Sequence, residues 1–446
     1  MLPSYSSAVG LAPRTPLVRW VQSVLPDKGW YETRRGLVWG FIVVHLVFLA
    51  ALLPNIINGT VEGDLPLYRV WAEGAATAGQ WPGITFEWVY PIGAFLPIGF
   101  ANIFGPANYQ LMWFLLTAAL NAASIVALTN RGRSINGYRA AWWWMGILVI
   151  LAPVGLLRLE GITAPLVIIA LAMIARHPVV AAILLAVATW IKVWPAAIFL
   201  AVIAALPSRR WIVATGAAVS VGIVGIVYAL GGLRFLTGFV QMQSDRALQL
   251  EAPVTTPWLW MAIMRRPGSF IYNNISISTR EVVGPYDDVA IKLMTPAMAV
   301  IAIAIVLLMV WARHRGADAN RLLLVGALAL AATMIVFNKV GSPQYMLWIA
   351  PIIAVGITNG WRPWRIPAML MLWISVLTTL VFPILYMPLI AGDPTVAAIL
   401  TLRNMLVIML LVWAIRELVR LGGRAAAQRT GIFESNPASL AQAVSR

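Results

Sequence analysis

The sequence contains no cysteine, few charged residues and only three histidines. Without cysteine the chain can form no disulfide and offers no thiolate as a nucleophile. The histidines, His45, His177 and His314, do not have the spacing of a zinc site. No glycine-rich loop of the phosphate-binding type is present either. We therefore expect neither a disulfide-stabilised nor a zinc-dependent nor a nucleotide-hydrolysing protein, and no cofactor is evident.

The sequence is rich in apolar residues. Hydrophobic residues make up 61% of the 446 residues and charged residues only 11%, with a mean hydropathy of +0.84. Apolar runs long enough to cross a bilayer core of ~30 Å recur along the chain. We predict an all-α polytopic membrane protein with about twelve crossings. The predicted spans are residues 37–57, 107–129, 141–157, 162–175, 179–191, 195–206, 211–230, 288–312, 321–337, 345–358, 365–390 and 396–416.

The net charge of +16 is concentrated in the segments that separate these spans on one side. By the positive-inside rule that side is the cytoplasm, which accounts for the basic excess without a nucleic-acid partner. Both termini are then cytoplasmic, and the lipid bilayer is an expected partner. We predict a cytoplasmic arm over residues 1–36, a single membrane domain over 37–416 and a disordered tail over 417–446. Two outer loops, 58–106 and 231–287, face the opposite side.

Asp64 is the first candidate for chemistry, because it follows the first span on the outer face. Residues 65–78 are predicted to form an interfacial helix, which would place Asp64 and Tyr68 on one face. An acid at a helix start has a structural alternative, since it can cap the free backbone N–H groups. The functional interpretation is favoured because other polar groups fall on the same side of the membrane.

Those groups are Arg158 and Glu160 between two spans, Lys192 at a tight hairpin, and Lys339 in a late loop. Cations at membrane depth are costly and usually have a partner or a function. Each could instead extend to the interface or form a structural ion pair. Together with Asp64 they describe an acid opposite several cations, which suits transfer of a group from a lipid phosphate.

The chemistry of such a transfer sets the roles. An attacking sugar hydroxyl needs a base, and the departing phosphate needs positive charge or hydrogen-bond donors. One carboxylate is enough for a single inverting displacement. Retention of configuration would require a second carboxylate close by, for which Glu62 and Glu160 are candidates. We favour inversion, with Asp64 as the base.

The order of short motifs along the chain resembles glycosyltransferase family 87, a group of integral membrane enzymes of the GT-C class. The motifs are Gly63-Asp64 with Tyr68, Tyr90-Pro91, Lys192 followed by Pro195, and Ser342-Pro343-Gln344-Tyr345. The resemblance spans residues 37–416. It implies a GT-C-like fold and transfer of a sugar from a polyprenyl-phosphate donor to a cell-envelope glycolipid or polysaccharide. Such enzymes act outside the cytoplasmic membrane, typically in actinobacteria.

The resemblance implies that Asp64 is the catalytic carboxylate of the first outer loop. Arg158, Lys192 and Lys339 are expected to bind the donor phosphate. The expected substrate-binding residues are Tyr68, Arg69, Tyr90, Glu160, Ser342, Gln344 and Tyr345. No metal ligand is assigned, and assistance by a divalent cation stays open. The chain departs from the family pattern in two places, with Ile92 rather than a second proline after Pro91, and Gln344-Tyr345 where several members have histidine.

Three alternatives remain at this stage. Mannose is the expected sugar, with arabinofuranose as the alternative, because residues 58–69 also resemble the arabinofuranosyl branch. The loop 231–287 mixes aromatic rings with carboxylates, which fits either acceptor binding or a helix at the interface. A secondary transporter or lipid flippase is the alternative of another class, although the chain shows no related halves.

Overall fold

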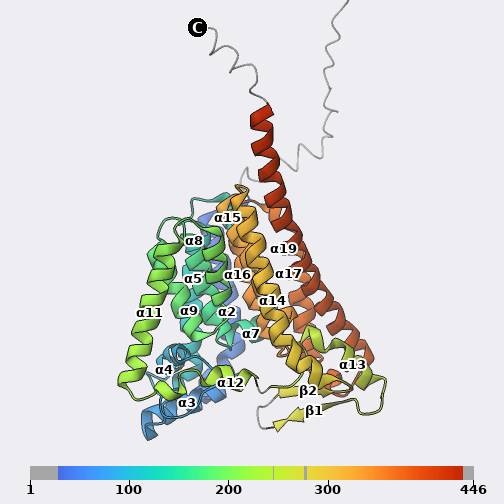
Figure 1. Cartoon of the computed structure of the whole chain (residues 1–446). Coiled ribbons are helices and arrows are strands. Elements are labelled where there is room, and N and C mark those ends of the chain that lie inside the picture. Colours follow the sequence, from blue (N-terminus) through green and yellow to red (C-terminus); the bar gives the residue numbers. More distant parts are fainter. Residues whose placement is uncertain (1–28, 245, 276–278, 435–446) are drawn as a thin grey trace, which may run out of the picture.

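The computed structural model describes residues 29–244, 246–275 and 279–434. Helices form most of the described chain (Figure 1). Each of the twelve predicted spans overlaps one main helix, which confirms the all-α polytopic architecture, but two spans are interrupted. The span 141–157 also takes in α7 (Ala152–Leu156), and the span 365–390 continues past α17 through a π-helical turn (Leu380–Ile384) into α18 (Tyr386–Ile390). These helices are α2 (Arg34–Asn58), α5 (Tyr109–Leu128), α6 (Ile135–Ile150), α8 (Glu160–Met173), α9 (Pro178–Ile191), α10 (Ala196–Ala205), α11 (Arg209–Ala229), α14 (Asp287–His314), α15 (Ala319–Val336), α16 (Met346–Thr358), α17 (Trp361–Thr379) and α19 (Pro394–Glu434).

Helix length divides the twelve into two groups. Seven are long and apolar enough to cross a membrane: α2, α5, α11, α14, α15, α17 and α19. Helices α6, α8, α9, α10 and α16 have 10 to 16 residues. At a rise of about 1.5 Å per residue they span at most about 24 Å, which is less than a full bilayer core.

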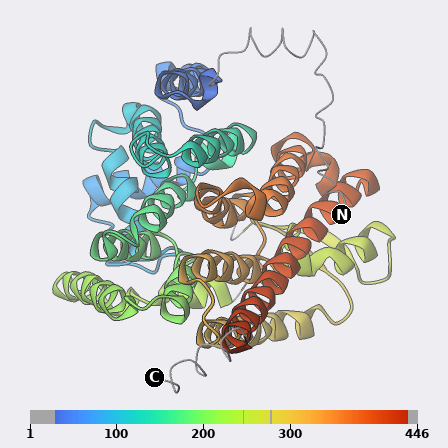
Figure 2. The ribbon, with the colours of Figure 1, turned by 90° about the horizontal axis from the view of Figure 1, so that it is seen from above.

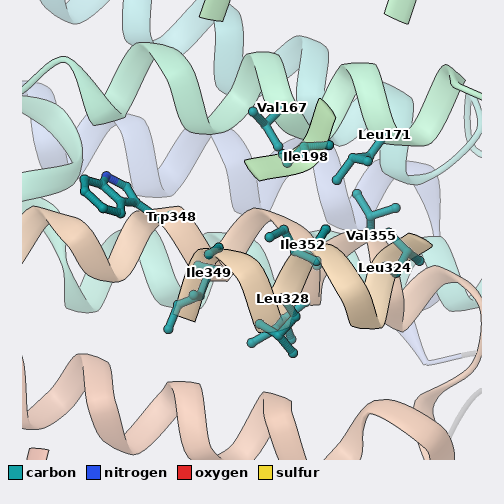
Figure 3. Close-up of a cluster of buried hydrophobic side chains, with 14 of the residues drawn as sticks. Val167, Leu171, Ile198, Leu324, Leu328, Trp348, Ile349, Ile352 and Val355 are labelled. Atoms are coloured by element: carbon teal, nitrogen blue, oxygen red, sulfur yellow. The ribbon is translucent and has the colours of Figure 1, made fainter. Parts of the chain in front are cut away.

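Burial differs strongly among the helices, and α15 and α16 lie in the interior of the bundle. All but one of the residues of α16 are buried, and 78% of the apolar window of α15 is buried against 11% for α14. Viewed from above, α2 lies at the edge of the bundle (Figure 2). Figure 3 shows the centre, where side chains of α8, α10, α15 and α16 meet. The labelled side chains there are Val167, Leu171, Ile198, Leu324, Leu328, Trp348, Ile349, Ile352 and Val355.

The first outer loop folds into two helices at one end of the bundle (Figure 1). The helix predicted over residues 65–78 is confirmed as α3 (Leu65–Ala78). The apolar run that follows forms a 3-10 turn (Ile92–Ala94) and the short helix α4 (Phe95–Ala101). Its ten residues, Ile92–Ala101, are too few to cross a bilayer, as expected.

The second outer loop, predicted either to bind the acceptor or to form a helix at the interface, contains both helices and strands. It contains the helices α12 (Gly238–Ser244) and α13 (Thr256–Ile263) and a two-stranded antiparallel hairpin. Strands β1 (Phe270–Asn274) and β2 (Thr279–Val283) pair with Tyr272 opposite Glu281. The hairpin was not predicted, because two five-residue strands give only a short alternating pattern.

The prediction of a disordered tail from residue 417 is wrong over residues 417–434, where α19 continues as a helix to Glu434. Leu418 and Leu421 are buried, and Glu417 pairs with Arg321 of α15. The Ala- and Arg-rich sequence also has a high helix propensity. Packing against the bundle therefore extends the helix beyond the predicted span. Residues 435–446 lie outside the described part of the chain.

Candidate functional site

Asp64 lies immediately before α3, but its side chain makes no capping hydrogen bond. Instead, one carboxylate oxygen is 3.4 Å from the Tyr68 hydroxyl and the other is 3.4 Å from an Nη atom of Arg158. The capping explanation therefore does not account for this acid. Gly63 has a φ of 68°, and a Cβ there would come within 2.7 Å of Leu157. A glycine is needed at this position for the loop to approach the segment that carries Arg158.

Arg158 connects three parts of the chain. It lies between α7 (Ala152–Leu156) and α8, and its Nη1 donates to the side-chain oxygens of Gln344 and, at 3.4 Å, of Ser342. Its guanidinium also lies 5.3 Å from the centre of the Phe382 ring. The Ser342-Pro343-Gln344 motif thus holds Arg158 against Asp64, so that two of the expected substrate-binding residues position a cation.

Lys192 forms a second ion pair close to the first. Its Nζ is 2.8 Å from a carboxylate oxygen of Glu160, a residue with no exposed surface. The indole N–H of Trp348 donates to the same oxygen at 3.3 Å, and Lys192 also lies 5.0 Å from the centre of the Tyr90 ring. Burial alone would lower the pKa of the Lys192 ammonium, but Glu160, Tyr90 and Tyr345 together outweigh it and hold this pKa above its ordinary value. Lys192 therefore stays charged.

Aromatic rings join the two ion pairs into one site. Tyr68 lies edge-on to Tyr90, with 6.2 Å between ring centres, and its ring also packs on Trp113 at 5.3 Å. Tyr345 stacks on Trp348 at 3.9 Å. Close-packed rings have few rotamers, so the polar groups that they surround are held in fixed places.

A cavity of about 300 Å³ lies on the Lys192 side of these rings. Its polar lining includes Tyr90, Lys192, Asn338, Lys339 and Tyr345. Helices α12, α14 and α15 contribute Phe239, Val240, Thr295, Met298 and Met334. The lining thus combines charged and apolar side chains, as an amphipathic ligand requires.

Asp64 does not line this cavity. Tyr68 contacts both Asp64 and Tyr90, and Tyr90 lines the cavity, so a single layer of aromatic rings separates the acid from it. Tyr345 also lines the cavity, and its phenolic hydroxyl can donate a hydrogen bond to a bound anion.

Burial also acts on the acid itself. It raises the pKa of the Asp64 carboxyl, while the charges of Arg158 and Lys192 and the hydrogen bond from Tyr68 oppose this effect. The resulting pKa lies above the ordinary value of an aspartate. A carboxylate with a raised pKa is a stronger base than a free aspartate, as proton removal from a hydroxyl requires.

Arg69 stays outside this cluster. Its guanidinium donates to the carbonyl of Gly59 at 2.9 Å and lies 3.6 Å from Glu73 of the same helix. These contacts hold α3 against the end of α2. Among the described residues, no three His, Asp or Glu side chains lie close enough together to hold a metal ion.

A third buried ion pair, Glu251 with Arg403, was not predicted. The Arg403 guanidinium donates to the Glu251 carbonyl at 2.9 Å and lies 3.6 Å from its carboxylate, and both side chains are almost fully buried. Next to it, the second outer loop contacts the segment that carries Lys339, since the Gln249 N–H donates to the Lys339 carbonyl at 2.9 Å.

The approach between these two segments is close. A Cβ on Gly341 would come within 2.2 Å of the Ala252 nitrogen. The second outer loop is therefore fastened to the segment that carries Lys339, Ser342 and Gln344. The one sequence feature that could have indicated the ion pair with Glu251 is Arg403, a charged residue deep in the last predicted span.

Changing Gln344 to leucine is expected to slow the reaction at this site without unfolding the protein. Leucine has a similar volume but cannot accept the Arg158 hydrogen bond, so the guanidinium is held less firmly against Asp64. We expect about a 10-fold lower turnover with little change in the apparent affinity for the donor. Steady-state kinetics of the sugar transfer that the sequence predicts would measure both, and a change in affinity alone would contradict the positioning role.

No protein-family model matches the chain, and no curated protein matches it. Among solved structures, the chain is similar to ArnT from Cupriavidus metallidurans in the apo state, with 14% sequence identity and a TM-score of 0.41. The similarity covers 88% of this chain and 78% of that chain. Similarity at this level assigns neither a family nor an activity, so the function has to be inferred from the side chains of the site.

Proposed function

We propose that the protein is an inverting membrane glycosyltransferase of the GT-C type. It would move a sugar from a polyprenyl-phosphate donor to a cell-envelope glycolipid or polysaccharide on the extracytoplasmic face of the cytoplasmic membrane. The observation that carries this proposal is the placement of the Asp64 carboxylate 3.4 Å from Arg158, one ring layer from a cavity that Lys192 and Lys339 line. Membership of glycosyltransferase family 87 stays a prediction.

The proposed step is a single displacement. The acceptor hydroxyl gives its proton to Asp64 as its oxygen forms a bond with the anomeric carbon, so the Tyr68 and Tyr90 rings that separate Asp64 from the cavity must shift when the substrates bind. The bond between that carbon and the phosphate oxygen breaks, and the polyprenyl phosphate leaves with the electron pair. Lys192, Lys339 and Arg158 supply the positive charge that stabilises this developing phosphate. The apolar walls near Met298 and Met334 provide a path for the prenyl chain toward the bilayer.

The surroundings of Glu160 favour inversion over retention. A nucleophile for a double displacement must reach the anomeric carbon, but Glu160 has no exposed surface and is engaged by Lys192 and Trp348. Its proposed role is to hold Lys192 in place. The position of the ion pairs at one end of the bundle also favours an enzyme over a transporter, whose sites lie near the middle of the membrane.

Mannose is the proposed sugar, with arabinofuranose as the alternative. Purified protein is given radiolabelled polyprenyl-phosphomannose and polyprenyl-phosphoarabinofuranose separately, with envelope glycolipid as acceptor. Transfer from one donor with inversion at the anomeric carbon supports the proposal and identifies the sugar. Movement of either lipid across a vesicle bilayer without transfer would identify a flippase instead.

The rate of transfer is expected to fall as the pH drops through the pKa of Asp64, because only the ionised carboxylate can accept a proton. Tyr68→Phe keeps the ring that packs on Trp113 but removes the hydroxyl that lowers this pKa. The acidic limb of the pH profile of kcat/KM should therefore move to higher pH in the variant. An unchanged profile, with normal protein abundance, would show that another group controls it.

A further inference from the structure

A second cavity lies at the opposite end of the bundle from the candidate site, where α2 begins and α5 ends. Its volume is about 480 Å³. The lining residues are Arg34, Leu37, Val38 and Phe41 of α2, Ala122, Ile125, Val126 and Thr129 from the end of α5, and Arg131, Gly132 and Tyr138. Apart from its two arginines it is thus lined mostly by apolar side chains of two membrane-spanning helices.

The arginines lie at the polar edge of this cavity and are exposed. Arg34 is the first residue of α2, and Arg131 belongs to the turn that connects α5 to α6. Neither makes an ion pair with any residue in the described part of the chain. Two guanidinium groups without an acidic partner at one cavity leave a local positive charge that an anion can neutralise.

The turn that presents Arg131 has a defined structure. Asn130, Arg131 and Gly132 all have positive φ, at 48°, 59° and 84°. The Tyr138 hydroxyl donates to the Gly132 carbonyl at 3.2 Å, and Arg176 donates to the side chain of Asn130 at 2.8 Å. Non-glycine residues adopt positive φ at a cost, so these contacts are needed to hold the turn. They keep the backbone of Arg131 beside the cavity.

We propose that this cavity binds an anionic phospholipid. The headgroup phosphate lies between Arg34 and Arg131, and an acyl chain runs along Leu37, Phe41 and Val126. Val126 is 52% exposed, so the cavity is accessible from the bilayer side. Basic pockets between spanning helices at the cytoplasmic surface are suited to such headgroups. The predicted topology places this end of the bundle in the cytoplasmic leaflet, where anionic lipids are found.

The N-terminal segment, residues 1–28, could also occupy this cavity, but its charge argues against this. Residues 1–28 contain Arg14, Arg19 and Lys28 but only one acid, Asp27. A segment with net positive charge is repelled by two arginines that pair with no acid of residues 29–244, 246–275 and 279–434, whereas a phosphodiester is attracted by them. A phospholipid is therefore the occupant that matches both ends of the cavity.

The test compares two double variants of the full-length protein in neutral detergent. Arg34→Gln with Arg131→Gln removes both cavity arginines. Arg35→Gln with Arg133→Gln removes the same charge from exposed neighbours that do not line the cavity. Phosphatidylglycerol and phosphatidylcholine are titrated into each, and binding is followed by native mass spectrometry. Inorganic phosphate, which has no acyl chain, is added in a parallel experiment to test whether the phosphate group alone competes with the lipid.

We expect the wild-type protein and the control variant to prefer phosphatidylglycerol, and the cavity variant to bind it about 30-fold more weakly, since each arginine near the surface contributes about 1 kcal/mol. Inorganic phosphate at the same concentration should not compete with the lipid. Equal losses in both double variants would reduce the effect to general surface charge and overturn the proposal. Unchanged binding in the cavity variant, or no preference in the wild type, would also overturn it.

Discussion

Replacing Asp64 with asparagine is expected to lower sugar transfer by about 10²- to 10⁴-fold, the range over which a general base contributes to catalysis. Asparagine has the same shape but cannot take the proton from the acceptor hydroxyl. The asparagine side-chain oxygen can still accept hydrogen bonds from Tyr68 and Arg158, so the substitution leaves neither group without a partner. Arg158 keeps its contacts with Ser342 and Gln344 in the variant. Protein abundance should therefore stay normal while transfer is lost.

The matched control for this variant is Glu62→Gln. Under the proposed inverting mechanism Glu62 takes no part in the reaction. It is exposed and lies two residues earlier in the same loop, so the substitution removes an equal charge while Asp64 keeps its contacts with Tyr68 and Arg158. Transfer of label from the polyprenyl-phosphate sugar is measured in membranes that contain equal amounts of each protein. The control should work at close to the wild-type rate. A near wild-type rate in Asp64→Asn would show that Asp64 is not the base.

The helices of this protein could be predicted from sequence because each depends on a local property. Hydropathy located the twelve main helices, seven of which are long and apolar enough to cross a membrane. The helical period placed Asp64 and Tyr68 on one face, where they are in contact. The β-hairpin and the end of α19 were missed for a different reason. The hairpin is too short for its pattern to stand out, and Leu418 and Leu421 are buried only through packing on the rest of the bundle.

The site was predictable as a set of residues, but its pairings were not. Arg158, Lys192 and Glu160 could be selected because charged groups near a membrane are rare. Their spacing along the chain could not show that Arg158 contacts Asp64 while Lys192 contacts Glu160, since these contacts depend on how α3, α8 and α9 pack. Glu251 and Arg403 illustrate the same limit, because 152 residues separate the two partners.

Lys192→Met is expected to destabilise the protein by about 3–5 kcal/mol, because it leaves the fully buried carboxylate of Glu160 without its cation. Combining it with Glu160→Gln removes both charges. The amide can still accept the hydrogen bond from Trp348, so most of the lost stability should return. Thermal unfolding of the two single variants and the double variant, in detergent, measures this recovery.

Sugar transfer separates the two roles of Lys192. If the ammonium stabilises the departing phosphate as well as pairing with Glu160, the double variant regains stability but not transfer. We expect its turnover to stay about 10²- to 10³-fold below that of the wild type, the usual effect of removing one group that stabilises developing charge. Glu160→Gln alone keeps the ammonium beside the cavity and should retain more transfer than the double variant. Recovery of transfer together with stability in the double variant would reduce Lys192 to a structural partner of Glu160 and remove it from the phosphate site.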